Sequence, residues 1–483
     1  MIVHKFGGTS VEDAQRFASV ADILIEHHNQ TNGAAVGETV VVVSAMSGVT
    51  NQLIAGARAA ADGKDSVYRE IKAGLLSRHL DVVETLLGHS PERLEVGGLV
   101  EDRLHELERL YRSIAVLGEL TVRGRDVVAS FGEQLSVSIL AAVLRERGVR
   151  AQAISATQLI VTDDNFGAAT PLMDQTRQRL RQQIRPLVQR GVIPVITGYI
   201  AATEEGVTTT LGRGGGDYTA AIVGAGLNAD EVWIWSDVDG ILTADPNIVP
   251  QARTLTELSY TEAVNLAYFG ADVLHPKTIR PVTESNIPLR IVNSFSPTHP
   301  GTLIVETPSP DRKLLPAIIS TTGLSMIAVG SQDDAASLTG DAASLTPLRM
   351  AARALQRLSE VDVDVLMFSQ SLSEHSLNLV VRQQDQAHCL EILRREFENG
   401  NQGSVFSLEV KEKVATISVV GVPGWNEIGI VSHAFLALGK HHTRVIAVAQ
   451  AATEHSVSFC VPEDQVADTV RFLHSELGLE GGN

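Results

Sequence analysis

The sequence has little cysteine, few positive charges for its length and no long apolar segment, and each shortage excludes a class of protein. Its two cysteines, Cys389 and Cys460, belong to no CxxC or cysteine–histidine pattern, so neither a disulfide framework nor a zinc site is expected. Lysine and arginine total 39 against 57 aspartates and glutamates, a formal charge of −18. So acidic a chain is not expected to bind nucleic acid or an anionic membrane through its overall field.

Signals for membrane insertion and export are also lacking. No apolar run approaches the roughly 18–20 residues that span a bilayer. Lys5 and the glycines after it interrupt any apolar region near the N-terminus. We therefore expect a cytoplasmic protein with reduced, buried thiols. With 483 residues, 44% of them hydrophobic and 20% charged, the chain should fold into more than one globular domain.

Short apolar runs alternate with helical patterns through the first 300 residues. The expected strands are Val40–Val43, 126–131, 192–200 and 231–235. Their alternation with helices, such as one expected over 133–147, predicts an α/β fold with a mostly parallel sheet covered by helices on both faces. Between about residues 52 and 120 leucines recur at helix spacing instead, which predicts a helical insertion on this scaffold.

Five prolines at positions 297, 300, 308, 310 and 316 mark a change of domain. We expect a first domain over residues 1–300, a linker over 301–316 and two modules over 317–398 and 410–483. The second part contains an internal repeat, because the sequence Val365–Leu377 returns 80 residues later as Val445–Val457. Each copy follows an earlier strand and lies between two helical patterns. This β-α-β-β-α order predicts two ferredoxin-like modules.

Both copies of the repeat carry a Glu-His pair, at His375 and His455. A metal site and a turn between two strands are both compatible with such a pair. No other ligand types gather nearby, which favours the turn. We predict no metal site.

The stretch Lys5-Phe-Gly-Gly-Thr-Ser10 follows a very short apolar run at the N-terminus. One interpretation is an ordinary strand-to-helix turn, in which glycines give flexibility and Thr9 or Ser10 caps the helix. The other is a phosphate site, in which the amides from Gly7 to Ser10 face an anion and Lys5 adds a charge. The motif is not a P-loop, because there the lysine follows the glycines.

Four further stretches are rich in glycine, hydroxyl and charged residues, and each is expected at the carboxyl end of a strand or just before a helix. They are Ser44–Asn51, Phe131–Gln134, Thr210–Tyr218 and Trp235–Gly240. In an open α/β sheet that edge binds ligands. The glycines would hold a polyphosphate, Arg213 would clamp a carboxylate, and Glu133 with Asp217 would hold an ammonium group. Individually each stretch also fits a turn, a helix cap or a first-turn acid; together they suggest ATP beside a small amino acid.

In combination and in order, these motifs resemble the signatures of the aspartate kinase family. The matching segments are Lys5–Val11, Ser44–Thr50, Ser130–Glu133, Leu211–Ala221 and Phe269–Pro276. The resemblance covers nearly the whole chain, since the two C-terminal repeats resemble the family's paired ACT modules, which bind amino-acid effectors. The repeats look closest to the kinase half of bifunctional aspartokinase–homoserine dehydrogenases. No dehydrogenase half is expected, because few residues follow the second module.

The resemblance implies an amino-acid kinase fold and transfer of the ATP γ-phosphoryl to the β-carboxylate of L-aspartate. The product would be 4-phospho-L-aspartate, the first step toward lysine, threonine and methionine. Lys5 would stabilise charge on the transferring group and Asp217 would order the site. The implied ligands of aspartate are Ser44, Thr50, Glu133, Arg213 and Gly214. The implied contacts of ATP, which would enter with Mg²⁺, are Gly7, Gly8, Thr9, Ser10, Ser236, Asp237 and Asp272.

Several positions depart from the common family pattern. Asp272 stands where many members have a lysine that reaches the nucleotide phosphates, and Gly216 replaces a common serine. Leu242 and Asn247 stand where some members have a tyrosine and an arginine. Lys277 and Arg280 are candidates to replace the lost charge.

The effector modules depart from the pattern as well. The run Thr346–Met350 lacks a glycine that relatives often have, and the usual Pro-Gly of the second module is Ile428-Gly429. Gln370 and Gln450 match glutamines that contact threonine in some relatives, although paired polar residues at strand ends would look the same. We expect threonine or lysine as effector, with weak threonine feedback as the specific hypothesis.

Three functions are compatible with these residues. The first is an active aspartate kinase, and the second is an amino-acid-binding regulatory protein whose kinase site is impaired, as Asp272 suggests. The third is a kinase of the same fold for another small carboxylate, such as glutamate or acetylglutamate. The presence of Lys5, Glu133, Arg213 and Asp217 favours the first. Because ACT modules commonly pair between chains, we expect a homodimer or a larger assembly.

Overall fold

The computed structural model describes residues 1–29, 38–268, 274–331, 347–361, 363–371, 376–397, 406–421, 429–450 and 456–480. The chain forms two compact units. The first unit comprises Met1–Ile241, Thr254–Ala267 and Asp272–Arg312, and the second comprises Leu242–Arg253, Tyr268–Ala271 and Lys313–Asn483. The two units are described separately below.

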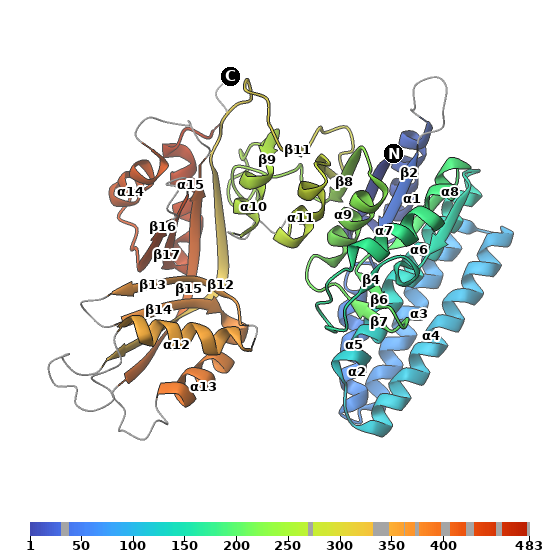
Figure 1. The fold of residues 1–483 in the computed structure, drawn as a ribbon, viewed down its shortest axis with the longest axis horizontal. Coiled ribbons are helices and arrows are strands. Elements are labelled where there is room, and N and C mark those ends of the chain that lie inside the picture. The colour runs from blue at the N-terminus through green and yellow to red at the C-terminus, as the bar shows by residue number, and fades with distance from the viewer. Residues whose placement is uncertain are drawn as a thin grey trace. The chain divides into compact units, whose positions relative to one another are not determined.

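An eight-stranded sheet forms the centre of the first unit, in the order β3-β5-β2-β1-β8-β10-β11-β9 (Figure 1). In that order the strands are Ala151–Ile154, Ile193–Thr197, Thr39–Val43, Ile2–Phe6, Glu231–Ser236, Leu289–Asn293, Thr302–Val305 and Glu257–Ser259. All neighbouring strands are parallel except β10 and β11. The predicted mostly parallel α/β sheet is therefore confirmed, and residues 302–305, which the sequence placed in a linker, belong to it.

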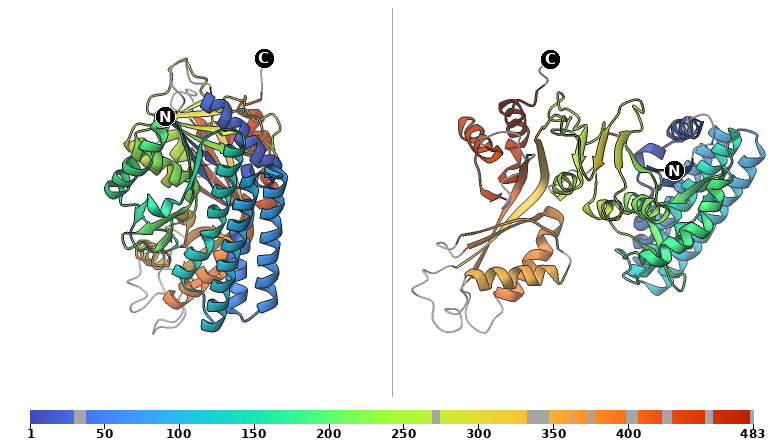
Figure 2. Two further views of the ribbon diagram at one scale, coloured as in Figure 1. Left: turned by 90° about the vertical axis from the view of Figure 1, so that its right-hand side faces the viewer. Right: turned by 45° about the horizontal axis from the view of Figure 1, so that its top comes forward.

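Helices cover both faces of this sheet, as Figure 2 shows. α1 (Ala14–Asn29) and α6 (Phe131–Glu146) contact each other and the strand β2. α9 (Gly215–Leu227) contacts β1, β2 and β8 and is flanked by α7 (Met173–Gln183) and α11 (Pro276–Glu284). The short helix α8 (Arg185–Gln189) packs on β5. Residues 40–43 are fully buried because they lie between two helical layers, which explains their uninterrupted run of valines.

The predicted helical insertion is a bundle of long helices. It consists of α2 (Val49–Ala61), α3 (Asp65–Leu87) and α4 (Pro91–Leu117). The hydroxyl of Tyr111 on α4 donates a 2.8 Å hydrogen bond to the carbonyl of Leu53 on α2. A Cβ at Gly56 would lie 2.6 Å from that hydroxyl, so only glycine permits this approach of the two helices.

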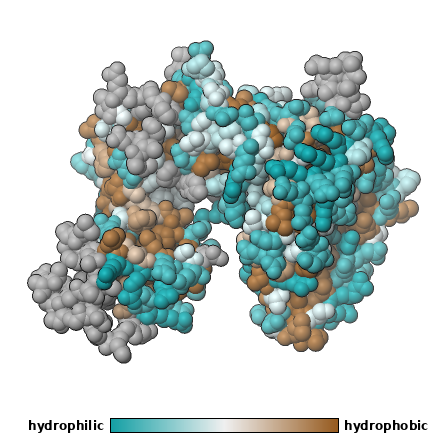
Figure 3. Space-filling model, viewed as in Figure 1, coloured by the Kyte–Doolittle hydropathy of each residue, from teal (hydrophilic) through white to brown (hydrophobic). Residues whose placement is uncertain are grey.

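Figure 3 shows apolar surface at the lower end of this bundle. Val116 and Leu117 at the end of α4 and Val122 at the start of α5 (Val122–Ala129) are exposed apolar residues. The stretch Val122–Glu146 is long and apolar enough to cross a membrane by composition alone, but 83% of its most apolar window is buried inside the protein. Core packing therefore accounts for its apolar character.

The strand predicted over residues 126–131 is wrong, because these residues form the end of α5 and the start of α6. The side chain of Thr121 accepts a 3.0 Å hydrogen bond from the amide of Gly124 and so caps α5. A short apolar run such as Val127–Ala129 is compatible with either a buried strand or a buried helix, and its periodicity does not distinguish them. The expected helix over 133–147 is confirmed as α6.

A small second sheet lies beside the main one in the first unit. Its order is β4-β6-β7, with β4 at Val161–Thr162, β6 at Ile200–Thr203 and β7 at Thr208–Thr210. β5 and β6 divide the single strand expected over 192–200. β7 leads directly into the glycine-rich stretch before α9, so this small sheet helps to position that stretch.

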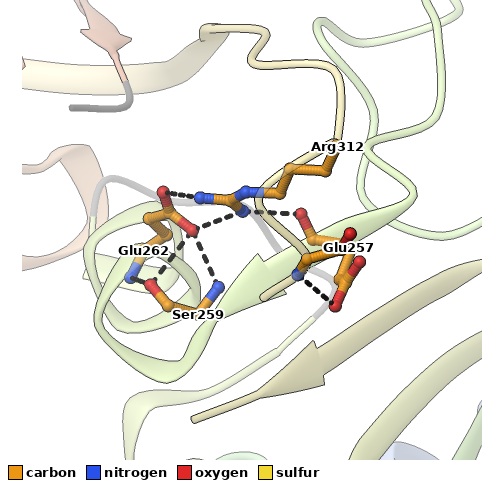
Figure 4. A network of polar contacts seen from close by, with 5 residues as sticks. Glu257, Ser259, Glu262 and Arg312 are labelled. Carbon is orange, nitrogen blue, oxygen red and sulfur yellow. Dashed lines mark hydrogen bonds and ion pairs between the residues drawn. The ribbon is translucent and has the colours of Figure 1, made fainter. Parts of the chain in front are cut away.

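The C-terminal segment ending the first unit is anchored by a polar network around Arg312 (Figure 4). Arg312 donates hydrogen bonds of 2.8 and 2.6 Å to the two carboxylate oxygens of Glu262 on α10 (Tyr260–Tyr268) and one of 2.8 Å to the carbonyl of Glu257. The Ser259 amide also donates to Glu262, at 2.7 Å. Burial alone would raise the pKa of Glu262, but the hydrogen bonds from Arg312 and Ser259 outweigh it and hold the pKa below its ordinary value.

The second unit contains the two repeats as one antiparallel sheet in the order β13-β14-β12-β15-β17-β16. Its strands are β12 (Ala317–Ser331), β13 (Val365–Ser371), β14 (Ser376–Arg382), β15 (Phe406–Val420), β16 (Ala447–Gln450) and β17 (Ser456–Pro462). Its helices are α12 (Pro347–Ser359), α13 (Gln386–Phe397), α14 (Ile430–Lys440) and α15 (Val466–Glu476). The predicted order of elements in each repeat is present.

The repeats are interleaved rather than consecutive, a feature that the sequence did not reveal. The first part of β12, residues 317–321, pairs with residues 416–420 of β15, whereas residues 324–331 pair with residues 406–414. Ile318 accordingly packs in the core of the second module with Phe459 and Leu473. Ile327, further along the same strand, packs in the core of the first module.

Candidate active site

The end of β1 and the turn after it form the first wall of the candidate site. The turn continues as a short 3₁₀ helix, Thr9–Val11. At the start of α1 the capping side chain is Asp13, which accepts a 2.9 Å hydrogen bond from the Arg16 amide, and not the predicted Thr9 or Ser10. The Ser10 hydroxyl is instead buried and hydrogen-bonded to the Ser294 hydroxyl at 2.9 Å. A Cβ at Gly8 would lie 3.0 Å from the carbonyl oxygen of Ala45, so a side chain here would press against the segment after β2.

Lys5 on β1 forms an ion pair with Asp217, which lies in the first turn of α9. Both side chains are largely buried, with exposed fractions of 12% and 16%. The N-terminal position of Asp217 is favourable because the helix dipole stabilises a carboxylate there. The structure thus brings together two predicted catalytic residues that are 212 positions apart in the chain.

The glycines at the start of α9 lie so close to four other segments that a side chain would clash. A Cβ at Gly216 would lie 2.8 Å from the Ser44 hydroxyl oxygen and 3.2 Å from Cε of Lys5. At Gly215 it would lie 2.6 Å from Cδ2 of Tyr199. At Gly214, where φ is +71°, it would lie 2.6 Å from Cβ of His275. Glycine at position 216, where family members commonly have serine, therefore leaves room for the Ser44 hydroxyl.

Glu133 lies in the first turn of α6 and is 3% exposed. One carboxylate oxygen accepts a 3.3 Å hydrogen bond from the amide of Ala45, and the other is buried without a partner. Burial raises the pKa of Glu133 to about 8, since the charged form is poorly solvated there. An unpaired buried carboxylate oxygen is costly, and a bound cationic group would relieve that cost. Thr50 follows Ala45 in the same segment and lies in the first turn of α2.

Two residues near this site were missed by the sequence analysis. Asp126 is buried and accepts hydrogen bonds from the Gly167 amide at 2.8 Å and from the Thr210 amide and hydroxyl at 3.0 and 2.9 Å. It therefore fixes the chain just before Arg213. Tyr199 has a φ of +65°, which is rare outside glycine and costs strain. The wrong strand prediction concealed Asp126, and no sequence signal marks Tyr199.

Two of the predicted nucleotide contacts, Ser236 and Asp237, lie at the end of β8 and directly after it. The Ser236 hydroxyl donates to the Asp237 carboxylate at 3.2 Å, and the Ser236 carbonyl accepts a 2.8 Å bond from the Ser294 amide. Asp272 lies outside the described residues. Arg280 is one of the two candidates to replace the positive charge that many family members have at position 272. It is exposed and forms a 2.8 Å ion pair with Glu284.

Two of the departures belong to the second unit. Leu242 and Asn247 lie in the segment Leu242–Arg253, which is grouped with that unit. Within it the Ile318 amide donates a 2.8 Å bond to the carbonyl of Thr243. The structure therefore assigns these two positions to a segment packed on the second module.

The predicted effector residues differ in environment. Gln370 lies on β13 and its side-chain nitrogen is buried without a partner, whereas Gln450 at the end of β16 is exposed. His375 and His455 lie outside the described residues. In the part of the chain that the structure describes, no three histidine, cysteine, aspartate or glutamate side chains are grouped to hold a metal ion.

Comparison with known proteins identifies the family. A model of the amino acid kinase family matches residues 1–293, and an ACT domain model matches residues 348–397 and 417–477. Aspartokinase 1, chloroplastic, from Arabidopsis thaliana is 32% identical over 491 residues, covering 99% of this chain and 80% of the relative. The chain belongs to the aspartokinases. Members of this family are ATP-dependent phosphotransferases, so the predicted family and enzyme class are confirmed.

The solved structures of aspartokinases agree. E. coli aspartokinase III in complex with aspartate and ADP, in its R-state, has a TM-score of 0.79 at 27% identity, covering 99% of this chain and 100% of the other. The same enzyme with lysine and aspartate, in its T-state, gives 0.77 at 27% identity, covering 99% of each chain. A bifunctional aspartokinase/homoserine dehydrogenase 2, chloroplastic, of Arabidopsis thaliana is also 32% identical, over 484 residues and 99% of this chain. The chain spans 50% of that relative's length.

Proposed function

We propose that this aspartokinase transfers the γ-phosphoryl group of ATP to the β-carboxylate of L-aspartate and that an amino acid bound at its ACT modules regulates the transfer. The observation that carries the proposal is the convergence of three segments at one sheet edge. Lys5 is paired with Asp217, and the backbone of Gly216 lies against both Lys5 and the hydroxyl of Ser44. The Lys5 ammonium group, the Ser44 hydroxyl and the N-terminus of α9 thus face one point. Such an arrangement stabilises the negative charge on a phosphoryl group during its transfer.

In the proposed reaction a carboxylate oxygen of aspartate attacks the γ-phosphorus while the bond from that phosphorus to the bridging oxygen of ADP breaks. The nucleophile is already ionised at neutral pH, so no general base is required. The transition state spreads negative charge over the transferring group, and catalysis depends on positioning and positive charge. Lys5 supplies that charge, and Asp217 holds its ammonium group in place.

Aspartate is assigned to the side of the site formed by the segments after β2 and at the start of α6. The unpaired oxygen of Glu133 is suited to the ammonium group of the substrate, and Arg213 to a carboxylate through its planar fork. Ser44, Thr50 and Gly214 complete the pocket in this proposal. A glutamate that is costly to ionise when the site is empty becomes a carboxylate once a cation is beside it.

ATP is assigned to the side formed by the turn after β1 and the segment after β8. Gly7, Gly8 and Thr9 would offer backbone amides to the phosphates, with Ser236 and Asp237 toward the rest of the nucleotide. Because the Ser10 hydroxyl already bonds to Ser294 and the Ser10 amide donates a 3.1 Å hydrogen bond to the carbonyl of Gly7, we assign Ser10 to holding this turn in shape rather than to direct phosphate contact. Magnesium enters as its complex with ATP and is treated as part of that substrate.

Regulation is assigned to the ACT modules. E. coli aspartokinase III has a solved structure with lysine and aspartate, which supports lysine as a candidate effector here beside threonine. The buried, unpartnered nitrogen of Gln370 is a suitable donor to an effector carboxylate or hydroxyl. A cytoplasmic location and a homodimer or larger assembly through these modules complete the proposal, and light scattering after size-exclusion chromatography tests the assembly.

The decisive experiment incubates the protein with ATP, magnesium and L-aspartate in hydroxylamine, which traps an acyl phosphate as its hydroxamate. We expect hydroxamate and ADP in equal amounts, dependent on aspartate. Replacing aspartate by glutamate or acetylglutamate tests the other small-carboxylate kinases. A folded protein that binds threonine or lysine yet forms no aspartate-dependent product would refute the kinase proposal and favour the regulatory protein instead.

A further inference from the structure

One guanidinium group joins the two turns that form the substrate side and the phosphate side of the site. Arg78 lies on α3, in the helical insertion, and is half-buried. Its Nη1 donates a 2.8 Å hydrogen bond to the carbonyl of Ser47, in the segment after β2. Its Nη2 donates a 3.0 Å bond to the carbonyl of Glu12, at the end of the 3₁₀ turn after β1.

The carbonyls of Glu12 and Ser47 are both free to accept a hydrogen bond from a side chain, because of where they lie in the backbone. Glu12 ends the 3₁₀ turn, and carbonyls at helix ends lack an intrahelical donor. Ser47 precedes Gly48, whose φ of +78° turns the chain before α2 starts. The planar fork of arginine presents two donors in a fixed geometry, so one side chain reaches both carbonyls. A lysine ammonium is a point donor and lacks this fork.

The two turns also touch directly, and Arg78 completes that contact. The Ser47 amide donates a 3.2 Å bond to the carbonyl of Gly8. With Gly8 so close to Ala45, the turns are in contact along their length. The strands that carry the turns, β1 and β2, pair in parallel, and the Ser44 amide donates a 3.1 Å bond to the carbonyl of Phe6 where they end. Beyond that point Arg78 is the side chain that joins the two turns.

We propose that Arg78 is a positioning residue that sets the distance between bound ATP and bound aspartate, although it touches neither. The inference rests on the proposed function, which assigns the turn Gly7–Ser10 to phosphate and the segment from Ser44 to aspartate. Transfer between two bound groups is sensitive to their separation, and a displacement of about 1 Å can cost about a hundredfold in rate. The helical insertion thereby acts on the reaction through one side chain.

The proposal separates binding from turnover. Each turn keeps its own ligand contacts when Arg78 is replaced, so the affinity for each substrate alone should persist. The change is in the distance and orientation of bound ATP relative to bound aspartate. We therefore expect Arg78→Gln and Arg78→Lys to lower kcat by about tenfold to a hundredfold, with dissociation constants for aspartate alone and for ADP alone changed less than about threefold.

The test combines calorimetric titration of each ligand with the hydroxamate assay on the full chain. Arg69→Gln serves as the matched control, because Arg69 is exposed on the same helix and contacts Asp65 and the ring of Tyr68 on that helix. Its kcat should equal that of the unchanged protein. Adding ethylguanidinium to Arg78→Ala should restore part of the rate, whereas ethylammonium should not.

The outcomes distinguish the possible failures. Unchanged kcat in a folded Arg78→Gln protein overturns the proposal, as does a fall in kcat matched by equal losses of both affinities, which would indicate a general structural role. If Arg78→Gln does not fold, the Arg78→Lys protein and the rescue experiment decide. Absence of aspartate-dependent product in the unchanged protein would instead overturn the proposed function.

Discussion

Lys5 and Asp217 form an ion pair between the central strand β1 and the first turn of α9. The pair places a positive charge at the sheet edge and neutralises it with the Asp217 carboxylate. Phosphate, carrying more negative charge than one carboxylate, is able to draw on the same ammonium group.

Replacement of Lys5 by alanine should reduce kcat by about a hundredfold to a thousandfold or more, because one preorganised charge at the transferring group typically contributes that much. Aspartate affinity should change far less. The hydroxamate assay and calorimetry measure the two effects. Lys64→Ala, which removes an exposed lysine paired with Asp62, is the control. Turnover retained in Lys5→Ala would contradict the role assigned to Lys5.

The pKa of Glu133, about 8, predicts how aspartate binding depends on pH. An ammonium group favours the ionised carboxylate, so binding below pH 8 should release a proton and affinity should rise with pH by up to about tenfold per unit between pH 6 and 8. Glu133→Gln should bind more weakly and remove this proton release. Calorimetry in buffers of different ionisation enthalpy measures it, with Glu146→Gln on the same helix as control.

The same raised pKa affects stability without ligand. Since the unfolded carboxyl ionises near its ordinary value of 4.5 and the folded one near 8, folding becomes less favourable as pH rises between these values. Glu133→Gln removes this cost. We expect its melting temperature to exceed that of the unchanged protein at pH 8.5 and the difference to disappear near pH 4.5. A pH-independent difference would contradict the pKa argument.

Gly216→Ser introduces the residue common in the family, yet it should impair this protein. The added Cβ would lie 2.8 Å from the Ser44 hydroxyl oxygen, so Ser44 must move. We expect the KM for aspartate to rise by about tenfold. Steady-state kinetics measures this, and Gly74→Ala, at an open position on α3, is the control. An unchanged KM would show that Ser44 does not bind aspartate.

Arg312→Ala should destabilise the edge of the first unit by about 2–4 kcal/mol, because it leaves the nearly buried carboxylate of Glu262 without its partner. Hydrogen exchange of the amides in β9 and α10 measures this locally, which is preferable because a chain of two units need not unfold in one step. Arg177→Ala, which breaks an exposed pair with Asp174, should change exchange little. Equal exchange in both variants would refute the anchoring role of Arg312.

Much of the fold was predictable because burial patterns are local. The valines of 40–43 indicated a strand buried on both faces, and the leucines of the insertion indicated helices. The run 126–131 was mispredicted because a few apolar residues fit a strand or a helix equally well. The interleaving of β12 and β15 was not predictable. Each is a 15-residue strand, and the sequence of such a strand does not indicate which half belongs to which module.

The sequence by itself determined the family, the order of the motifs and the residue types at the site. Binding of phosphate and of an amino acid needs glycines, a lysine and carboxylates, and these residues are recognisable from their order in the chain. Only the tertiary structure decided which groups meet. It paired Lys5 with Asp217, left one oxygen of Glu133 unpartnered, engaged the Ser10 hydroxyl with Ser294 and joined two turns through Arg78. These contacts join residues far apart in the chain, and their geometry exists only once the sheet has formed.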